Sequence, residues 1–449
     1  MNARRFRLHL SSAQVIIAGF LSVILLGTLL LSLPCATSSG ERASFLDALF
    51  TATSSVCVTG LVVHHTATYW SLFGQAVILL LIQTGGMGVV TIAVTVTMIS
   101  GRRIGLMQRS TMQEAISAHH VGGIVKLTGF ILRTTFLIEL AGALLLSVVF
   151  CSDYGPVRGL WYGLFHSVSA FCNAGFDLMG RSESYASLTE YVGQPLVNLV
   201  VMLLIVIGGI GFLTWEDVKT NRFHFRAYRM QTKVILTSTL ALIVLPAAYF
   251  YFGEFSGGEW AGEPAGKRVL AALFQSVTAR TAGFNTADLT AMSQSGQSLL
   301  ILLMLIGGAP GSTAGGIKTT TAVVLLTSTL SLFRRRETIR CFGRRIDERV
   351  VRDAVAILLM YLVLFFFGAL LMSRIEGIPM LSCLFETASA IGTVGLTLGI
   401  TPGLSAASRV LLIALMFVGR VGGLTLIFAA FSGVQHYAAR LPMEKITVG

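Results

Sequence analysis

Long apolar stretches alternate with short polar segments along the whole chain. Eight of these stretches approach or exceed the roughly 20 residues that a helix needs to cross a bilayer. Backbone polar groups inside lipid must find partners within the protein, so helices are the expected form. The expected spans lie near residues 12–34, 71–99, 127–151, 194–214, 233–253, 297–326, 353–373 and 408–432. The pattern predicts an all-α integral membrane protein.

A shorter apolar motif recurs four times between these stretches, as a Leu-Phe pair followed nine or ten residues later by a glycine. The motifs run from Phe50 to Gly60, from Phe165 to Gly175, from Phe274 to Gly283 and from Phe385 to Gly395. Successive glycines are 115, 108 and 112 residues apart. A period this steady indicates four copies of one structural unit.

Each motif is apolar enough to enter the membrane but too short to cross it. A dozen helical residues, as from Met380 to Ile391, reach roughly 18 Å, against a hydrocarbon core of about 30 Å. The chain must then return, and extended backbone at that depth is tolerated only where it is buried or lines water. Rings of carbonyl oxygens can replace the hydration shell of a cation, and glycine lets an ion approach the main chain.

We therefore interpret the four motif ends as an ion selectivity filter, the alternative being four ordinary extracellular turns. The predicted filter residues are Val58, Thr59 and Gly60, then Asn173, Ala174 and Gly175, then Thr281, Ala282 and Gly283, and finally Thr393, Val394 and Gly395.

The second long stretch of the third unit contains a segment that a helix could hardly cross, with five glycines and a proline in ten residues. A broken helix at membrane depth usually lines the permeation path, so we interpret this segment as a movable gate, the alternative being a static kink. The predicted gate residues are Gly307, Gly308, Ala309, Pro310, Gly311, Ser312, Thr313, Ala314, Gly315 and Gly316. Glycine clusters in the other three second stretches indicate close helix packing.

Arg420 lies inside the last apolar stretch, where a charge is costly. We expect it to face the pathway and to hydrogen-bond carbonyls of the interrupted segment, holding the gate closed or repelling a second cation. Pairing with Glu139, or extension of the side chain to the interface, are the alternatives. His166 and Glu386 occupy equivalent places in two motifs and are expected to anchor their short helices by hydrogen bonds.

Composition and charge place and orient the chain. Of its residues 54% are hydrophobic and only 12% are charged, against about 25% charged in a soluble domain. The segments between units and both termini hold 22 of the 33 basic residues, which predicts that these segments are cytoplasmic. We expect the protein itself to lie in the cell inner (plasma) membrane. Because the net charge of +12 follows topology, we exclude a nucleic-acid partner. Attraction to anionic lipid or to an acidic cytoplasmic partner remains open.

Residue patterns typical of enzymes are missing from the sequence. The eight histidines form no HExxH motif, no paired carboxylates share a helical face, and the six cysteines show no metal-ligand spacing. Ile317 separates Gly316 from Lys318, whereas a phosphate-binding loop needs the lysine directly after the glycine. We predict that the protein is not an enzyme.

Together these segments resemble the Trk/Ktr/HKT superfamily of cation transporters, and most closely its KtrB-type subunit. The matching stretches are Thr59–Leu61, Phe171–Phe176, Arg280–Asn285, Gly392–Thr397, Gly307–Lys318 and the Gly-Arg pair at Arg420. The resemblance implies four M1–P–M2 repeats around a single central pore, with eight transmembrane helices plus four re-entrant pore helices. The repeats would be 12–110, 111–225, 226–340 and 341–432, with cytoplasmic ends at 1–11 and 433–449.

The resemblance also implies a function and partners. The chain would take up K+ through the backbone carbonyls of the filter, with Na+ as a second candidate ion and no covalently bound cofactor. Glycine at all four filter positions favours potassium, while a sodium or non-selective transporter of the same architecture is the alternative. Subunits of this kind form homodimers and sit on a cytoplasmic RCK-type, nucleotide-binding regulatory ring that is KtrA-like.

Overall fold

Each of the four units begins with a long apolar helix. The computed structural model describes residues 11–93, 106–116, 123–180, 185–222 and 224–431. The first helices are α1 (Ser12–Leu31), α7 (Ile124–Tyr154), α11 (Met230–Tyr249) and α15 (Glu348–Glu376). Within the described residues these four, with α11 prolonged to Glu254, are each long and apolar enough to cross a membrane. Exposed leucines such as Leu25 and Leu29 line the outer face of α1, as contact with lipid requires.

A shorter helix follows in each unit and packs against the first helix of its own unit. These shorter helices, which the sequence analysis predicts to be pore helices, are α2 (Phe45–Val56), α8 (Pro156–Phe171), α12 (Ala265–Thr278) and α16 (Met380–Gly392). The phenylalanine of each sequence motif is completely buried: Phe50, Phe165, Phe274 and Phe385. The recurring Leu-Phe pair therefore marks the start of a helix face that enters the core of the protein.

The second helices begin where the sequence offers a cap. Serine side chains accept a hydrogen bond from the first turn of α4 (Leu72–Met87), α13 (Gln294–Leu305) and α17 (Ala406–Val421), and such N-caps stabilise a helix start. Pro195 occupies the first turn of α9 (Pro195–Gly209), where its missing N–H costs nothing.

All four second helices are interrupted, not only the one in the third unit. The expected spans 71–99, 194–214 and 408–432 each contain a break that the sequence analysis did not predict, although residues 94–99 and 432 lie outside the described residues. Gly88, Gly211 and Gly422 adopt positive φ angles of 85°, 89° and 88°, which end the right-handed helix. Beyond Gly211 the chain turns by 95° into α10 (Phe212–Asn221), and beyond Gly422 it forms α18 (Gly423–Phe431). The predicted interruption in the third unit is confirmed, because residues 306–318 separate α13 from α14 (Thr319–Phe333).

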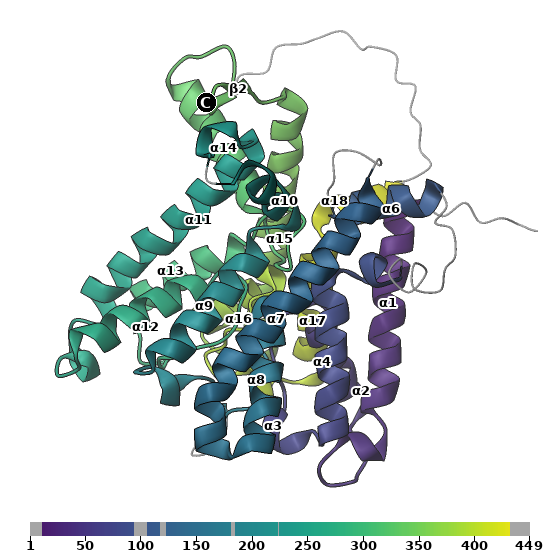
Figure 1. Ribbon diagram of the computed structural model, residues 1–449, viewed down its shortest axis with the longest axis vertical. Helices are drawn as coiled ribbons and strands as arrows, with labels where there is room; N and C mark the ends of the chain where they lie inside the picture. Colours follow the sequence, from purple (N-terminus) through teal and green to yellow (C-terminus); the bar gives the residue numbers. More distant parts are fainter. Residues whose placement is uncertain (1–10, 94–105, 117–122, 181–184, 223, 432–449) are drawn as a thin grey trace, which may run out of the picture.

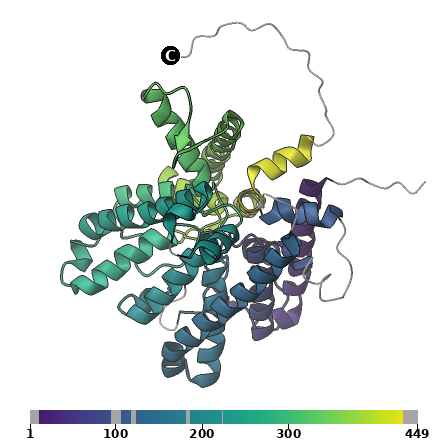
Figure 2. The ribbon, with the colours of Figure 1, turned by 45° about the horizontal axis from the view of Figure 1, so that its top comes forward.

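The four units are arranged in sequence order around the middle of the molecule (Figure 2). Figure 1 shows α6 (Leu106–Ile116), α10, α14 and a small hairpin, β1 (Arg340–Cys341) with β2 (Arg344–Arg345), at one end, and α3 (Thr66–Tyr69) at the other. The predicted terminal segments 1–11 and 433–449 lie outside the described residues, except for Ser11.

Candidate functional site

The four loops that follow the pore helices share one backbone conformation. Two positions upstream of each glycine, Val58, Asn173, Thr281 and Thr393 have φ angles between 50° and 64°. The glycines Gly60, Gly175, Gly283 and Gly395 have φ angles between 69° and 92°. A left-handed conformation is unfavourable for a β-branched residue, and strain of this kind concentrates at functional sites. The repetition indicates that all four loops follow the same main-chain path.

Hydroxyl groups of the pore helices hold these loops in place. The backbone N–H of Gly60 donates to Ser54 Oγ over 3.1 Å, and that of Gly395 donates to Ser389 Oγ over 3.0 Å. In the second unit Ser169 Oγ donates to the carbonyl of Phe176 instead, over 2.7 Å. These side-chain hydrogen bonds thus satisfy buried polar groups of the loop backbones. They do not involve the carbonyls of the predicted filter residues.

The loops contact one another in a closed cycle. A Cβ atom built on Gly60 would lie 2.4 Å from the carbonyl oxygen of Ala174, and one on Gly175 would lie 2.7 Å from that of Ala282. The cycle continues from Gly283 to the Val394 oxygen at 2.4 Å. It closes from Gly395 back to the Thr59 oxygen at 2.1 Å. Each glycine therefore faces the main chain of the next unit, at distances that no side chain tolerates.

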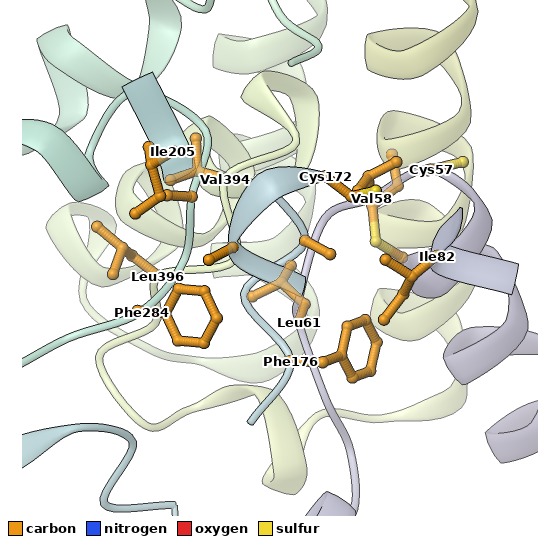
Figure 3. Close-up of a cluster of buried hydrophobic side chains, with 14 of the residues drawn as sticks. Cys57, Val58, Leu61, Ile82, Cys172, Phe176, Ile205, Phe284, Val394 and Leu396 are labelled. Carbon is orange, nitrogen blue, oxygen red and sulfur yellow. The ribbon is translucent and has the colours of Figure 1, made fainter. Parts of the chain in front are cut away.

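Apolar side chains directly after the glycines hold the cycle on one side. Leu61, Phe176, Phe284 and Leu396 are at most 2% exposed. Figure 3 shows these four side chains around the loops, together with Val58, Cys57 and Cys172. Buried packing of this kind restricts how far the loops can move.

A cavity of about 200 Å³ opens beside the glycine cycle and is lined by all four glycines, with Asp177, Asn285 and Thr397 among its other residues. Asp177 accepts a hydrogen bond from the backbone N–H of Met179 over 3.0 Å. Burial nevertheless raises the pKa of this carboxyl to about 7. Asp288 also lines the cavity, so two carboxyl groups lie beside the four glycines.

The segment between α13 and α14 forms a loop that closes on itself. The N–H of Gly307 donates to the Ile317 carbonyl over 2.8 Å, and that of Thr319 donates to the Gly308 carbonyl over 3.0 Å. Gly311 accepts a hydrogen bond from the N–H of Phe212 over 2.8 Å. The loop is therefore held against the break between α9 and α10.

The same loop reaches a residue of the predicted filter, Asn173. Thr313 Oγ1 donates to Asn173 Oδ1 over 2.9 Å, and the Thr313 N–H donates to the Gly208 carbonyl over 3.3 Å. A second cavity, of about 290 Å³, is lined by Ser312 and Ala314 and by Lys318 and Arg420. It shares no lining residue with the cavity at the glycine cycle, so the loop faces a separate space.

Arg420 hydrogen-bonds carbonyls of two separate elements. One guanidinium nitrogen donates to the carbonyl of Thr313 in the loop, and the other donates to the carbonyls of Gly85 and Gly86 near the end of α4. The expected contact with the interrupted segment is present, whereas the contact with α4 was not foreseen. Glu139 instead accepts a hydrogen bond from Gln83 over 3.1 Å, so the alternative pairing with Arg420 is wrong.

The glycine clusters of the second helices bring backbone onto backbone. A Cβ atom on Gly85 would lie 2.0 Å from the Val56 oxygen, and one on Gly208 would lie 2.0 Å from the Phe171 oxygen. Both oxygens belong to the last residue of a pore helix. The predicted close packing is confirmed, and it seats the ends of the pore helices at fixed positions.

His166 and Glu386 form hydrogen bonds at the backs of their loops. His166 Nε2 accepts from the N–H of Leu178 over 3.2 Å. The carboxylate of Glu386 accepts from the hydroxyls of Thr397 and Thr401, the latter over 3.0 Å. Both side chains are fully buried, so their anchoring role agrees with the expectation.

Four first helices long and apolar enough to cross a membrane, shorter helices with buried faces and a cycle of main-chain loops define a multi-pass membrane protein with a mostly helical fold. The model of the family described as "TrkH: Cation transport protein" matches residues 7–435. The chain belongs to this family, whose members are transporters and not enzymes.

Similar proteins cover nearly the whole chain. The "Ktr system potassium uptake protein B" of Bacillus subtilis is 40% identical over 97% of this chain and 96% of its own length. The "Potassium/sodium uptake protein NtpJ" of Enterococcus hirae is 39% identical over 99% of both chains. The crystal structure of the potassium transporter TrkH from Vibrio parahaemolyticus covers 95% of this chain and 86% of its own, with a TM-score of 0.71 at 21% identity. That structure supports the fold.

Proposed function

We propose that the protein takes up potassium through a pore on the axis of the four glycine loops. The closed cycle from Gly60 through Gly175 and Gly283 to Gly395 carries this proposal, because it brings four equivalent main-chain segments to one place. Carbonyl oxygens of the predicted filter residues would replace the water around the ion. An inward-negative potential of 100 mV supplies about 2.3 kcal/mol per charge, so uptake needs no chemical fuel.

The loop of residues 307–316 would be the gate. Its hydrogen bonds connect it to two residues of other units. One is Asn173 of the second filter segment, and the other is Arg420 on α17, the second helix of the fourth unit. Opening requires the loop to leave at least one of them. A loop built from glycine and small residues can adopt such a second arrangement at low cost.

The full architecture would be eight membrane crossings and four re-entrant pore helices, with the repeat boundaries predicted from the sequence. Under it both termini are cytoplasmic, in accord with the distribution of basic residues. The relatives named as Ktr system proteins support a subunit that works with others. We expect a homodimer in the membrane that is controlled by a cytoplasmic ring of RCK-type, nucleotide-binding subunits.

The test is ion uptake into liposomes by the purified protein, with potassium and sodium in competition. We expect Gly60→Ser to weaken the preference for potassium, because a Cβ atom there displaces the Ala174 carbonyl. Gly403→Ser is the matched control, since a Cβ atom on this glycine meets nothing within 4 Å. Unchanged selectivity in Gly60→Ser, with a control that behaves as wild type, would refute carbonyl coordination at this loop.

A sodium-conducting or non-selective transporter of the same architecture is the second candidate. The relative named as a potassium/sodium uptake protein favours it, because it is 39% identical over nearly the full chain. The same competition experiment separates the two, since sodium uptake equal to potassium uptake in wild-type protein would select this candidate.

A further inference from the structure

An apolar groove lies beside the gate loop, at the end of the molecule that carries the β-hairpin. It has a volume of about 470 Å³, within the range typical of sites for small ligands, and apolar atoms provide most of its lining. Its walls come from three helices, with Val234 on α11, Val323 and Val324 on α14 and Ile357 on α15. The α11 and α15 residues that line the groove all belong to the first ten residues of these helices, so the groove lies at one end of both helices.

One end of the groove is rich in arginine. The segment 334–353 contains eight arginines against four acidic residues, and Arg345 lines the groove together with Asp347 and Asp353. Three of the eight lie in the hairpin strands, and the other five lie within seven residues of those strands along the chain. Figure 1 shows the hairpin at one end of the molecule. Among the described residues none of these eight side chains forms an ion pair. Exposed arginines without a carboxylate partner are well suited to bidentate bonds with a phosphate.

We propose that the groove binds an anionic phospholipid, with one acyl chain along Val323, Val324 and Ile357 and the phosphate at Arg344 and Arg345. The apolar lining matches an acyl chain and the unpaired arginines match the headgroup charge, so the two ends of the site fit the two ends of one molecule. A water-soluble acidic protein would match only the arginines.

Binding there would act on the gate. Pro310 of the gate loop lines the groove, and the next residue, Gly311, is bonded to the N–H of Phe212. A chain that fills the groove therefore contacts the gate loop at Pro310, three residues before Thr313, which bonds to Asn173. This consequence for transport depends on the proposed function, whereas the binding itself does not.

The test measures lipid retention and transport separately. Native mass spectrometry of the purified protein compares palmitoyl-oleoyl phosphatidylglycerol with the matched phosphatidylcholine. Arg344→Gln/Arg345→Gln removes the headgroup contacts, and Val324→Trp fills the groove while leaving the arginines. Arg158→Gln/Arg374→Gln is the control, because it removes two exposed arginines at the opposite end of the molecule. Elution volume and melting temperature confirm that each variant is folded.

We expect the wild type to retain phosphatidylglycerol in preference to phosphatidylcholine. The hairpin double variant should bind phosphatidylglycerol roughly 25-fold more weakly, from about fivefold for each arginine removed. Val324→Trp should lose retention as well, and the control should match wild type. Equal retention of the two lipids, or unchanged retention in the hairpin variant, would overturn the proposal. So would a hairpin variant that keeps the lipid but no longer binds a cytoplasmic Ktr subunit.

Potassium uptake into vesicles then tests the effect on the gate. Vesicles of phosphatidylethanolamine with phosphatidylglycerol should give faster uptake than vesicles with phosphatidylcholine, and the hairpin variant should abolish the difference. If no vesicle supports uptake, the proposed function fails while the retention measurement still stands. If uptake occurs but is equally fast with both lipids, the effect on the gate is refuted.

Discussion

Arg420 offers the sharpest test of how the pore is closed. Its guanidinium group joins the Thr313 carbonyl of the gate loop to the Gly85 carbonyl of α4, two elements from different units. If the gate opens by moving the loop away, the bond to Thr313 breaks while the arginine stays on its helix. The closed state is then favoured by the free energy that this hydrogen bond contributes.

A hydrogen bond to a charged group contributes roughly 1.5–3 kcal/mol, and each 1.4 kcal/mol changes an equilibrium about tenfold. Arg420→Ala should therefore raise the open fraction by roughly ten- to a hundredfold when regulatory subunits are absent. Potassium leak from liposomes that contain only this protein, measured per folded molecule, reports the change directly.

Two further variants separate hydrogen bonding from charge. Arg420→Lys keeps the charge but loses the fork that reaches both carbonyls, so it should leak more than wild type. Lys318→Met is the control, since within the described part of the chain Lys318 Nζ donates only to the Ala314 carbonyl of its own loop, over 2.7 Å. Wild-type leak in Arg420→Ala would refute the reasoning. A leak in Arg420→Ala with none in Arg420→Lys would assign closure to electrostatic repulsion.

Three other predictions follow from the same site. Burial raises the pKa of Asp177 to about 7, so its negative charge is present above that pH and is lost below it; potassium uptake should fall as the pH drops through 7 in wild type but not in Asp177→Asn. Cys57 and Cys172 are both fully buried, so thiol reagents should label the exposed Cys35 without changing flux, and a Cys57→Ser/Cys172→Ser variant should respond no differently. Deletion of residues 308–315 should raise flux without regulatory subunits; a deleted protein that elutes as an intact assembly and still shows wild-type flux would make the loop purely structural.

Much of the site could be predicted from the sequence because its chemistry resides in the main chain. A pore helix followed by a glycine at a constant step is visible as a repeat. The interrupted segment after α13 was also predictable, since five glycines and a proline are incompatible with a helix in any environment. The cost of a charge within an apolar stretch pointed to Arg420.

The sequence does not distinguish the glycines that break a helix, which are Gly88, Gly211 and Gly422, from the glycines at which two helices pack closely. A glycine inside an apolar run is compatible with a tight helix contact and also with a positive φ angle. The structure shows both outcomes side by side, with Gly85 pressed onto Val56 and Gly88 ending the helix three residues later. Local sequence does not decide between them, because the deciding contact comes from another helix.

The sequence by itself determined the number of units, the loops that hold the glycines and the residues able to interrupt a helix, because these depend on local composition and spacing. Only the tertiary structure decided which main chains meet. The order of the cycle from Gly60 to Gly395, the bond between Thr313 and Asn173 and the second anchor of Arg420 on α4 join residues more than 100 positions apart. Such contacts arise from the packing of whole helices, and no periodicity along the chain encodes them.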